Sequence, residues 1–394
     1  MKKLLIIGAS VLQLPAILKA KEMGFYTAVA DYNPQAIGIP YADEYFNVST
    51  IDADGVTACA EKFRPDGIFT LATDMPMRSI AAAAKALSLP AISPETAIKA
   101  TDKGEMIKAF EAAGVEHPWY FILSSPEELE AVLPKIDYPC ISKPTDNSGS
   151  RGVMLIHNEE ELKDAIRYSS ENGRSGGVIV EEYLRGSEVS VEVIVLDGVP
   201  HVLQVTDKLT TGAPHFVEMG HSQPSRLPEK DISAIKDLAS RAALSVGIQN
   251  GPAHVEIMLT EKGPRMIELG ARMGGDCITT HLVPLSTGVD MVGSCIKIAC
   301  GETPDITPKK QRGSAIRFFD APSGIIESIE GIEKAKAIPG VTEISFTKSV
   351  GDQSGEIGSS VDRAGFVIAE AATPEEAVAI CERALAAVKI TVKH

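Results

Sequence analysis

The chain has 394 residues, of which 44% are hydrophobic and 23% are charged, and its formal net charge is −15. This length and composition predict a globular protein of two or three domains. An acidic chain without a basic stripe, in which aromatic residues make up only 5%, argues against nucleic acid as the main partner.

The six cysteines are scattered, with no C-x-x-C pair and no Cys/His cluster at zinc spacing. We therefore expect reduced thiols in a cytoplasmic protein. The apolar run at the N-terminus stops at Gly8, too early for a signal peptide. No apolar stretch is long enough to span a membrane, so no membrane partner is expected.

The first third of the chain has a β-α-β-α rhythm, which predicts a doubly wound parallel sheet. A buried strand, a helix, a strand, a further strand and an alanine-rich helix are expected in turn at residues 3–8, 12–23, 27–31, 67–74 and 79–87.

A dinucleotide site in this region is disfavoured. Asp31 stands about where a ribose-binding acid would, but Gly8 is followed by no second or third glycine of the fingerprint. The loops around Ser10, Asp31 and Asp74 lie at strand ends, where clefts of such sheets form, and are candidates for contact with a small substrate.

A phosphate site is predicted in the middle of the chain. Residues 93–115 are expected to be helical, with Ser93 as N-cap and Pro94 as first helical residue. Later, a strand that carries Lys143 precedes a small, polar, glycine-bearing loop, Thr145–Gly152, whose N–H groups can fold over an anion. The alternative is a hairpin turn with a surface lysine.

The next segment offers groups for a nucleoside. Residues 178–184 predict a strand that runs into a linker, where groups from Glu181 to Leu184 could contact adenine. Glu188 begins the following alternating strand and could hold ribose hydroxyls. Solvated strand positions are the alternative interpretation.

Residues 208–224 are predicted to form a glycine-punctuated loop that holds His215, Glu218 and His221. Loops on a rigid scaffold commonly carry specificity. Substrate contact is preferred here over a zinc site, because the spacing matches no usual zinc motif.

A hairpin is predicted at residues 253–276, with a turn at Glu261–Pro264. Glu256 and Glu268 would lie close together on one face of its two strands. Such carboxylates repel, and a hard cation such as Mg²⁺ relieves the repulsion while it accepts phosphate oxygens. Two solvent-facing glutamates are the alternative.

Three features follow the second glutamate. Arg272 has a guanidinium suited to phosphate or carboxylate. Gly274 and Gly275 allow a backbone to approach a ligand closely. Asp276 is a candidate contact for a substrate ammonium group.

Residues 309–394 predict a small α+β unit that closes over the preceding part. Arg317 in its first strand either reaches the active site or is a structural strand arginine. No internal repeat and no biotin- or lipoyl-type attachment motif is present.

Taken in order, these motifs resemble the ATP-grasp superfamily of carboxylate–amine ligases over nearly the whole chain. Residues 208–224, 313–324 and 363–369 are most similar to the L-amino-acid ligase (dipeptide synthase) branch, the last two also to biotin carboxylase. The implied fold is α/β and α+β. It comprises an N-terminal doubly wound parallel-sheet domain at 1–95, a two-lobed ATP-grasp clamp at 96–308 and a C-terminal α+β cap at 309–394. The small lobe of the clamp is expected at about 112–184 and its large lobe at about 185–308.

The resemblance implies roles for individual residues. Lys103 and Lys143 would hold ATP phosphates under a loop of Ser148, Gly149 and Ser150, with Glu181, Tyr183 and Leu184 around adenine and Glu188 on the ribose. Glu256 and Glu268 would bind Mg²⁺ or Mn²⁺. The residues that act in catalysis would be Arg272, Lys143 and Glu268. The residues that contact the substrate would be His215, Glu218, His221, Arg272, Gly275 and Asp276. Many members carry a further metal-binding asparagine where this chain has Gly270.

The implied reaction activates a carboxylate as an acyl phosphate and joins it to an amine. The partners would be small-molecule substrates, with an amino acid among them, and a second copy in a homodimer. The alternatives are a carboxylase or formyl-phosphate enzyme of nucleotide biosynthesis, a non-catalytic ATP-binding sensor and a nicotinamide-dependent oxidoreductase.

Overall fold

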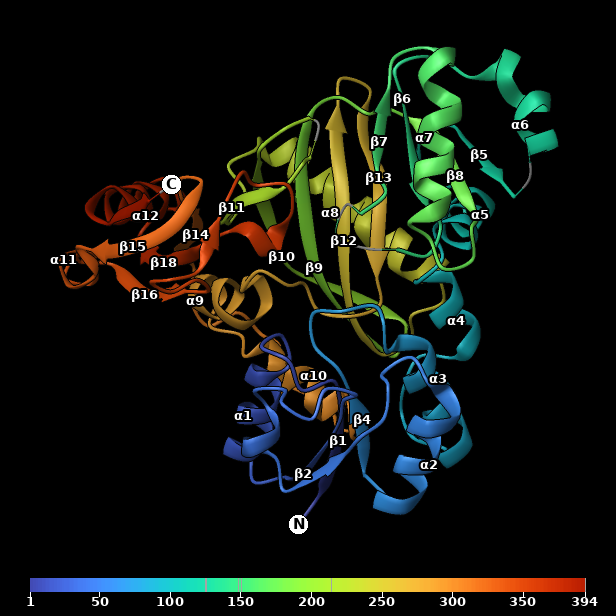
Figure 1. Cartoon of the computed structure of the whole chain (residues 1–394). Helices are drawn as coiled ribbons and strands as arrows, with labels where there is room; N and C mark the ends of the chain where they lie inside the picture. Colours follow the sequence, from blue (N-terminus) through green and yellow to red (C-terminus); the bar gives the residue numbers. More distant parts are fainter. Residues whose placement is uncertain (125, 148, 150, 214, 394) are drawn as a thin grey trace.

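The computed structural model describes residues 1–124, 126–147, 149, 151–213 and 215–393. Over these residues the strands form four sheets. Figure 1 shows the N-terminal sheet at the bottom, two antiparallel sheets above it and the C-terminal strands to one side.

The N-terminal sheet is parallel throughout, in the order β3-β2-β1-β4. Leu4 to Ile7 of β1 have no exposed surface, as expected for a parallel strand covered on both faces. The predicted doubly wound sheet is therefore confirmed. Its elements are β1 (Lys3–Ile7), α1 (Leu14–Glu22), β2 (Tyr26–Ala30), η1 (Ile39–Tyr41), β3 (Glu44–Phe46), α2 (Ala53–Phe63), β4 (Gly67–Phe69) and α3 (Met77–Leu87).

The predicted helix at 93–115 is two helices, α4 (Pro94–Lys99) and α5 (Lys103–Ala112). Ser93 caps the first, as expected. Asp102 begins the second, because its carboxylate accepts hydrogen bonds from the N–H groups of Gly104 and Glu105.

A small antiparallel sheet follows, in the order β5-β8-β6-β7. The strand that carries Lys143 lies inside it, between two neighbours. Its elements are β5 (Tyr120–Leu123), α6 (Pro126–Val132), η2 (Leu133–Lys135), β6 (Cys140–Pro144), β7 (Met154–Ile156), α7 (Glu159–Glu171) and β8 (Val178–Glu182).

The largest sheet has the order β13-β12-β9-β10-β11-β14-β18-β16. Its first five strands come from the middle of the chain, and α8 (Glu229–Ser245) packs on several of them. They are β9 (Ser187–Leu196), β10 (Val199–Thr210), β11 (Glu218–Gln223), β12 (Gly251–Thr260) and β13 (Gly263–Gly270).

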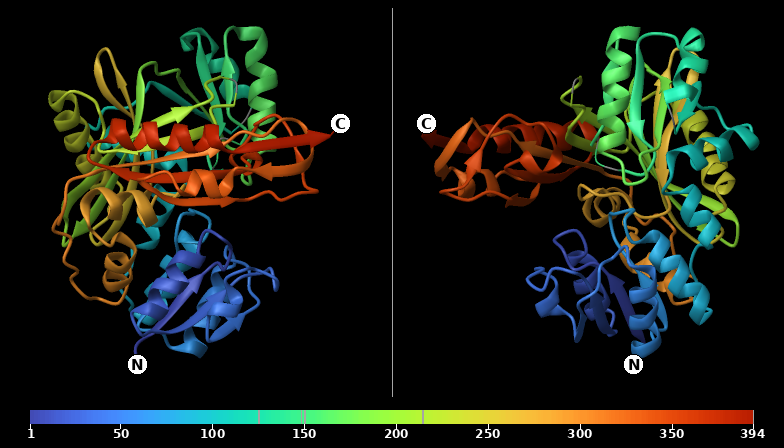
Figure 2. Two further views of the ribbon diagram at one scale, coloured as in Figure 1. Left: turned by 90° about the vertical axis from the view of Figure 1, so that its left-hand side faces the viewer. Right: turned by 45° about the vertical axis from the view of Figure 1, so that its right-hand side comes forward.

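The last three strands of this sheet belong to the C-terminal segment, so the predicted cap continues the central sheet. Figure 2 shows this segment as a slab that projects from the rest. Its elements are β14 (Gly313–Phe319), β15 (Gly324–Glu330), α11 (Ile332–Lys336), β16 (Val341–Phe346), β17 (Gln353–Ser354), η4 (Ser360–Asp362), β18 (Gly365–Ala371), α12 (Pro374–Ala387) and β19 (Lys389–Lys393). The helices η3 (Ile278–Leu282), α9 (Val283–Thr287) and α10 (Met291–Ala299) precede it.

The prediction of a loop at 208–224 was wrong. Its first residues end β10 and its residues 218–223 form β11, and His221 lies on β11 with 2% of its surface exposed. The sequence of β11, Glu-Met-Gly-His-Ser-Gln, lacks the β-branched and aromatic residues typical of strands, and tertiary pairing decides its conformation.

All six cysteines are free thiols, as their scattered positions predicted. Among the described residues, no single helix has the length and apolar character needed to cross a membrane. Only the sharply bent pair Ile278–Thr287 and Met291–Ala299, with a bend of 116°, meets that criterion jointly.

Candidate active site

A cleft of about 930 Å³ lies between the small sheet and the large one. It gathers residues that the sequence had singled out from distant segments. They are Lys103, Lys143, Gly149, Glu181, Tyr183, Leu184, Glu188, Glu218, Glu256 and Glu268. Ser148 and Ser150, predicted to cover ATP phosphates, lie outside the described residues.

Glu256 and Glu268 face each other across the β12–β13 hairpin, as predicted. Lys103 Nζ lies 3.1 Å from Glu268 Oε2, and Lys208 Nζ lies 3.5 Å from Glu256 Oε2. Burial would raise the pKa of Glu256, but the charge of Lys208 and the contact from His254 hold it well below its usual range. Glu256 is therefore ionised at neutral pH.

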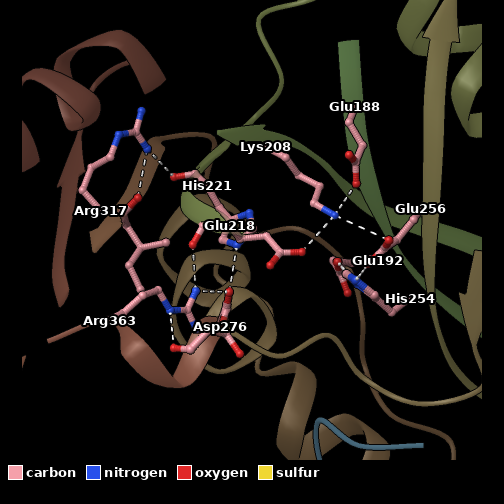
Figure 3. Close-up of polar contacts among 12 residues, drawn as sticks. Glu188, Glu192, Lys208, Glu218, His221, His254, Glu256, Asp276, Arg317 and Arg363 are labelled. Atoms are coloured by element: carbon pink, nitrogen blue, oxygen red, sulfur yellow. Dashed lines mark hydrogen bonds and ion pairs between the residues drawn. The ribbon is translucent and has the colours of Figure 1, made fainter. Parts of the chain in front are cut away.

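Lys208 contacts three carboxylates that line the cleft, Glu188, Glu218 and Glu256 (Figure 3), and sequence reasoning assigned it no role. Its Nζ lies 2.5 Å from Glu188 Oε1 and 3.5 Å from Glu218 Oε1, and its side chain is only 3% exposed. The sequence signal for such a role was the position of this lysine at the end of a strand-like run, V-L-Q-V-T-D-K. The predicted loop began at this lysine, whereas β10 continues to Thr210.

His254 lies between Glu192 and Glu256 and contacts both carboxylates. Its Nδ1 lies 2.7 Å from Glu192 Oε1 and its Nε2 lies 3.4 Å from Glu256 Oε1. Burial would lower the pKa of His254, but the charge and hydrogen bond of Glu192 raise it to about 9. Gly274 packs against this pair, and a Cβ there would come within 2.6 Å of His254 Nδ1.

The donor set fits a magnesium ion that binds together with a nucleotide. Mg²⁺ usually takes one or two carboxylates and completes its shell with phosphate oxygens and water. Glu256 and Glu268 supply such a pair. Within the described part of the chain, no group of three or more His, Cys, Asp or Glu side chains is arranged to hold a metal by protein ligands alone.

Arg272 is oriented by the N-terminal domain. Its Nε and Nη2 donate to the two carboxylate oxygens of Asp74, at 3.0 and 2.9 Å. Asp74 follows β4 at the carboxyl end of the parallel sheet, where a substrate contact was expected. The loop instead supplies a carboxylate that fixes the guanidinium plane.

Asp276 is held by an arginine from the C-terminal segment, and the sequence did not predict this. Arg363 donates to both of its carboxylate oxygens at 2.8 Å, and His221 Nε2 lies 3.3 Å from one of them. Burial opposes ionisation, but the bonds from Arg363 and His221 hold the pKa of Asp276 well below its usual range. Both oxygens have protein partners, which disfavours the predicted contact with a substrate ammonium.

Comparison with known proteins identifies the family. The ATP-grasp domain matches residues 136–280, and the L-amino acid ligase C-terminal domain 2 matches residues 317–393. The chain thus carries an ATP-grasp domain followed by an L-amino acid ligase C-terminal domain. The resemblance drawn from the motifs is thereby confirmed, including its L-amino-acid ligase branch.

Two curated relatives are similar in sequence to most of this ATP-grasp chain. The uncharacterized protein y4rH of Sinorhizobium fredii is 29% identical over 85% of this chain and 68% of that protein. Alanine–anticapsin ligase of Bacillus subtilis is 27% identical over 76% of this chain and 67% of that protein.

Two solved structures have the same fold over the whole ATP-grasp chain. L-amino acid ligase from Bacillus licheniformis matches with a TM-score of 0.88 at 23% identity, covering 100% of this chain and 99% of that one. Phosphoribosylglycinamide synthetase from Anaerococcus prevotii matches with a TM-score of 0.82 at 25% identity and covers 100% of both.

The two carboxylates predicted to contact the nucleoside, Glu181 and Glu188, both have lysine partners. Lys143 Nζ lies 2.5 Å from Glu181 Oε1, and both side chains are less than a tenth exposed. Glu188 is paired with Lys208. Residues 181–184 all line the cleft. Because the Glu181 carboxylate has a lysine partner, the rest of this linker is the better candidate for adenine contact.

Other predicted residues lie apart from the cleft of this ATP-grasp protein. His215 is exposed between β10 and β11. Arg317 is buried, and its Nη1 donates to the backbone oxygens of His221 and Ile316, which matches the structural alternative for that residue. The Asp31 carboxylate accepts from the N–H groups of Ala9 and Asn33 and so stabilises its own loop.

Proposed function

We propose that this ATP-grasp ligase activates a carboxylate as an acyl phosphate and joins it to an amine, with an amino acid as a substrate. The observation that carries the proposal is the position of Glu256 and Glu268, which face each other in the cleft while Asp74 fixes Arg272 four residues further on. The match of the C-terminal segment to the L-amino acid ligase domain supports an amino acid.

In the first step, the substrate carboxylate attacks the γ-phosphorus of ATP and ADP leaves. Lys103, Lys143 and Gly149 line the cleft, and they would hold the phosphates. Tyr183 and Leu184 lie where the linker would contact adenine. Mg²⁺ held by Glu256 and Glu268 would neutralise charge on the phosphate oxygens.

In the second step, the amine nitrogen attacks the acyl carbon, phosphate leaves, and the nitrogen loses a proton. Arg272 can stabilise the oxyanion, because Asp74 holds its guanidinium in one orientation. Glu218 lines the cleft with 29% of its side chain exposed, and its carboxylate suits an ammonium group. A closed cleft would protect the acyl phosphate from water.

A second candidate is a ligase for a phosphoribosyl substrate. Phosphoribosylamine–glycine ligase of Methanocaldococcus jannaschii is 25% identical over 100% of this chain and 95% of that protein. Such an enzyme would use the same acyl phosphate chemistry with a larger, anionic amine substrate.

The test is ADP release with Mg·ATP across single and paired amino acids, with phosphoribosylamine plus glycine, bicarbonate and formate as separate arms. Turnover that requires an amino acid as acid and another as amine supports the proposal. Turnover only in the phosphoribosylamine, bicarbonate or formate arm would replace the substrate class.

The metal assignment is tested by Glu268→Gln, with Glu261→Gln in the exposed turn of the same hairpin as control. We expect the first variant to lose about a hundredfold or more in kcat and the second to match the wild type. Near-normal turnover of Glu268→Gln at saturating Mg²⁺ would refute the assignment.

A further inference from the structure

One arginine of the C-terminal segment, Arg363, contacts Asp276 and the backbone of Glu218, a residue that lines the cleft. Arg363 follows η4 and is 9% exposed. Its Nη1 and Nη2 bind both oxygens of Asp276, its Nη1 also donates to the backbone oxygen of Glu218 at 3.0 Å, and its Nε donates to Ser360. The guanidinium lies 3.7 Å from the centre of the Phe318 ring.

The segment that Arg363 holds has an unusual backbone. Asp276 and Cys277 both have left-handed φ angles, 49° and 60°, although neither is glycine. Such conformations persist only where the surroundings impose them. The two hydrogen bonds from Arg363 to Asp276 are such a constraint, and they act on the turn at residues 275–277, a few residues after Arg272.

Arg363 also contacts β11, whose first residue, Glu218, lines the cleft. Glu218 begins β11, and its backbone oxygen is bound to the same Nη1 that binds Asp276. Figure 3 shows Arg363 between these two segments, on the far side from Lys208. The Glu218 carboxylate remains directed toward Lys208 and the cleft.

The geometry points to Arg363 as a positioning residue for the amino-acid site: it couples the C-terminal segment to the Glu218 strand and the Asp276 turn, and so sets the spacing between the ammonium-binding carboxylate and Arg272. This inference rests on the proposed function. Arg363 itself touches no reacting atom. It acts through Asp276 and the backbone of Glu218.

The test compares Arg363→Met and Arg363→Lys with Arg312→Met. Arg312 lies in the same C-terminal segment and pairs with Glu370 at 2.6 Å, at a half-exposed site that does not line the cleft. We expect Arg363→Met to raise the KM for the amino-acid substrates about tenfold to a hundredfold and to leave the Kd for Mg·ADP within about twofold. Arg363→Lys should recover part of the lost amino-acid affinity, because lysine keeps the positive charge although it cannot bind both oxygens of Asp276 as the guanidinium does.

A role limited to stability would lower kcat with the amount of folded enzyme and leave the amino-acid KM unchanged, and that result would overturn the inference. Equal losses in nucleotide and amino-acid binding would overturn it as well. Adding Asp276→Asn to Arg363→Met should cost little more than Arg363→Met alone, since both act through one contact.

Hydrogen exchange separates this inference from the proposed function, because it needs no turnover. Arg363→Met, but not Arg312→Met, should speed exchange in residues 216–221 and 274–282. Unchanged exchange there would refute the positioning role even if amino-acid ligation is observed. A wild-type enzyme that releases no ADP with any amino acid would refute the proposed function even if exchange changes as expected.

Discussion

The ion pairs in and around the cleft are of two kinds: lysines pair with glutamates, whereas Arg272 and Arg363 pair with aspartates. The lysine region comprises the pairs Lys103–Glu268, Lys143–Glu181 and Lys208–Glu188. The arginine region comprises Arg272–Asp74 and Arg363–Asp276.

The two kinds of pair have different consequences. An ammonium is a compact charge on a flexible stem and can turn from a carboxylate to a phosphate when one arrives. A guanidinium that binds both oxygens of one carboxylate fixes the orientation of both groups. The lysine region is thus suited to exchange partners during binding, and the arginine region to keep one geometry.

The largest expected effect comes from Lys208→Met, which removes the cation shared by three carboxylates. Loss of one partner of a buried charged cluster costs about 3–5 kcal/mol. We expect the melting temperature to fall markedly at about pH 8 and less at about pH 5, where the acids can take up protons. Added Mg²⁺ should restore part of the loss by contact with Glu256.

Thermal unfolding at both pH values checks this prediction. Lys336→Met is the control, since Lys336 forms an exposed pair with Glu333. Equal losses at both pH values would contradict a charge-based role for Lys208.

Arg272→Lys tests the arginine region, because lysine keeps the positive charge but cannot form the two parallel hydrogen bonds that Arg272 donates to Asp74. Loss of one well-placed stabilising donor lowers kcat by about 10²–10³-fold. Affinity for Mg·ADP should change little. Arg265→Lys on the preceding strand β13 is the control in steady-state assays. A loss of less than about tenfold for Arg272→Lys would show that the two-bond contact with Asp74 is dispensable.

The His254–Glu192 pair behind the lysine region predicts a pH-dependent stability. The folded-state pKa of about 9 exceeds the ordinary value of 6.5. The stabilisation is therefore complete below pH 6.5 and is lost as pH rises through about 9, and the shift bounds it at about 3 kcal/mol.

Denaturant unfolding in metal-free buffer across this range measures that contribution. The free energy of unfolding of the wild type should fall more steeply with pH than that of His254→Gln. Parallel curves for the two proteins would mean that the pair does not hold the extra proton.

The smallest effect is expected for Arg317→Met. Arg317 is a buried arginine whose described acceptors are backbone oxygens, and burial lowers its pKa. An apolar side chain of similar length should change the free energy of unfolding by about 1 kcal/mol or less, in either direction. Steady-state kinetics should be unchanged, and a raised amino-acid KM would assign Arg317 to the site after all.

The sequence by itself determined the parallel N-terminal sheet, the β12–β13 hairpin and the facing pair Glu256 and Glu268. These features depend on short-range periodicity, turn residues and the two-residue repeat of a strand, all of which can be read within about twenty residues. The order of the motifs was also sufficient to place the chain among the ATP-grasp ligases.

Only the tertiary structure decided the partners of the cleft residues. Arg272 meets Asp74 across 198 positions of the chain, and Asp276 meets Arg363 across 87. Lys208 acquires its role only because β9, β10, β11 and β12 bring four carboxylate and ammonium groups together. Local spacing carries no information on such contacts, since sheet order and the packing of distant segments select them.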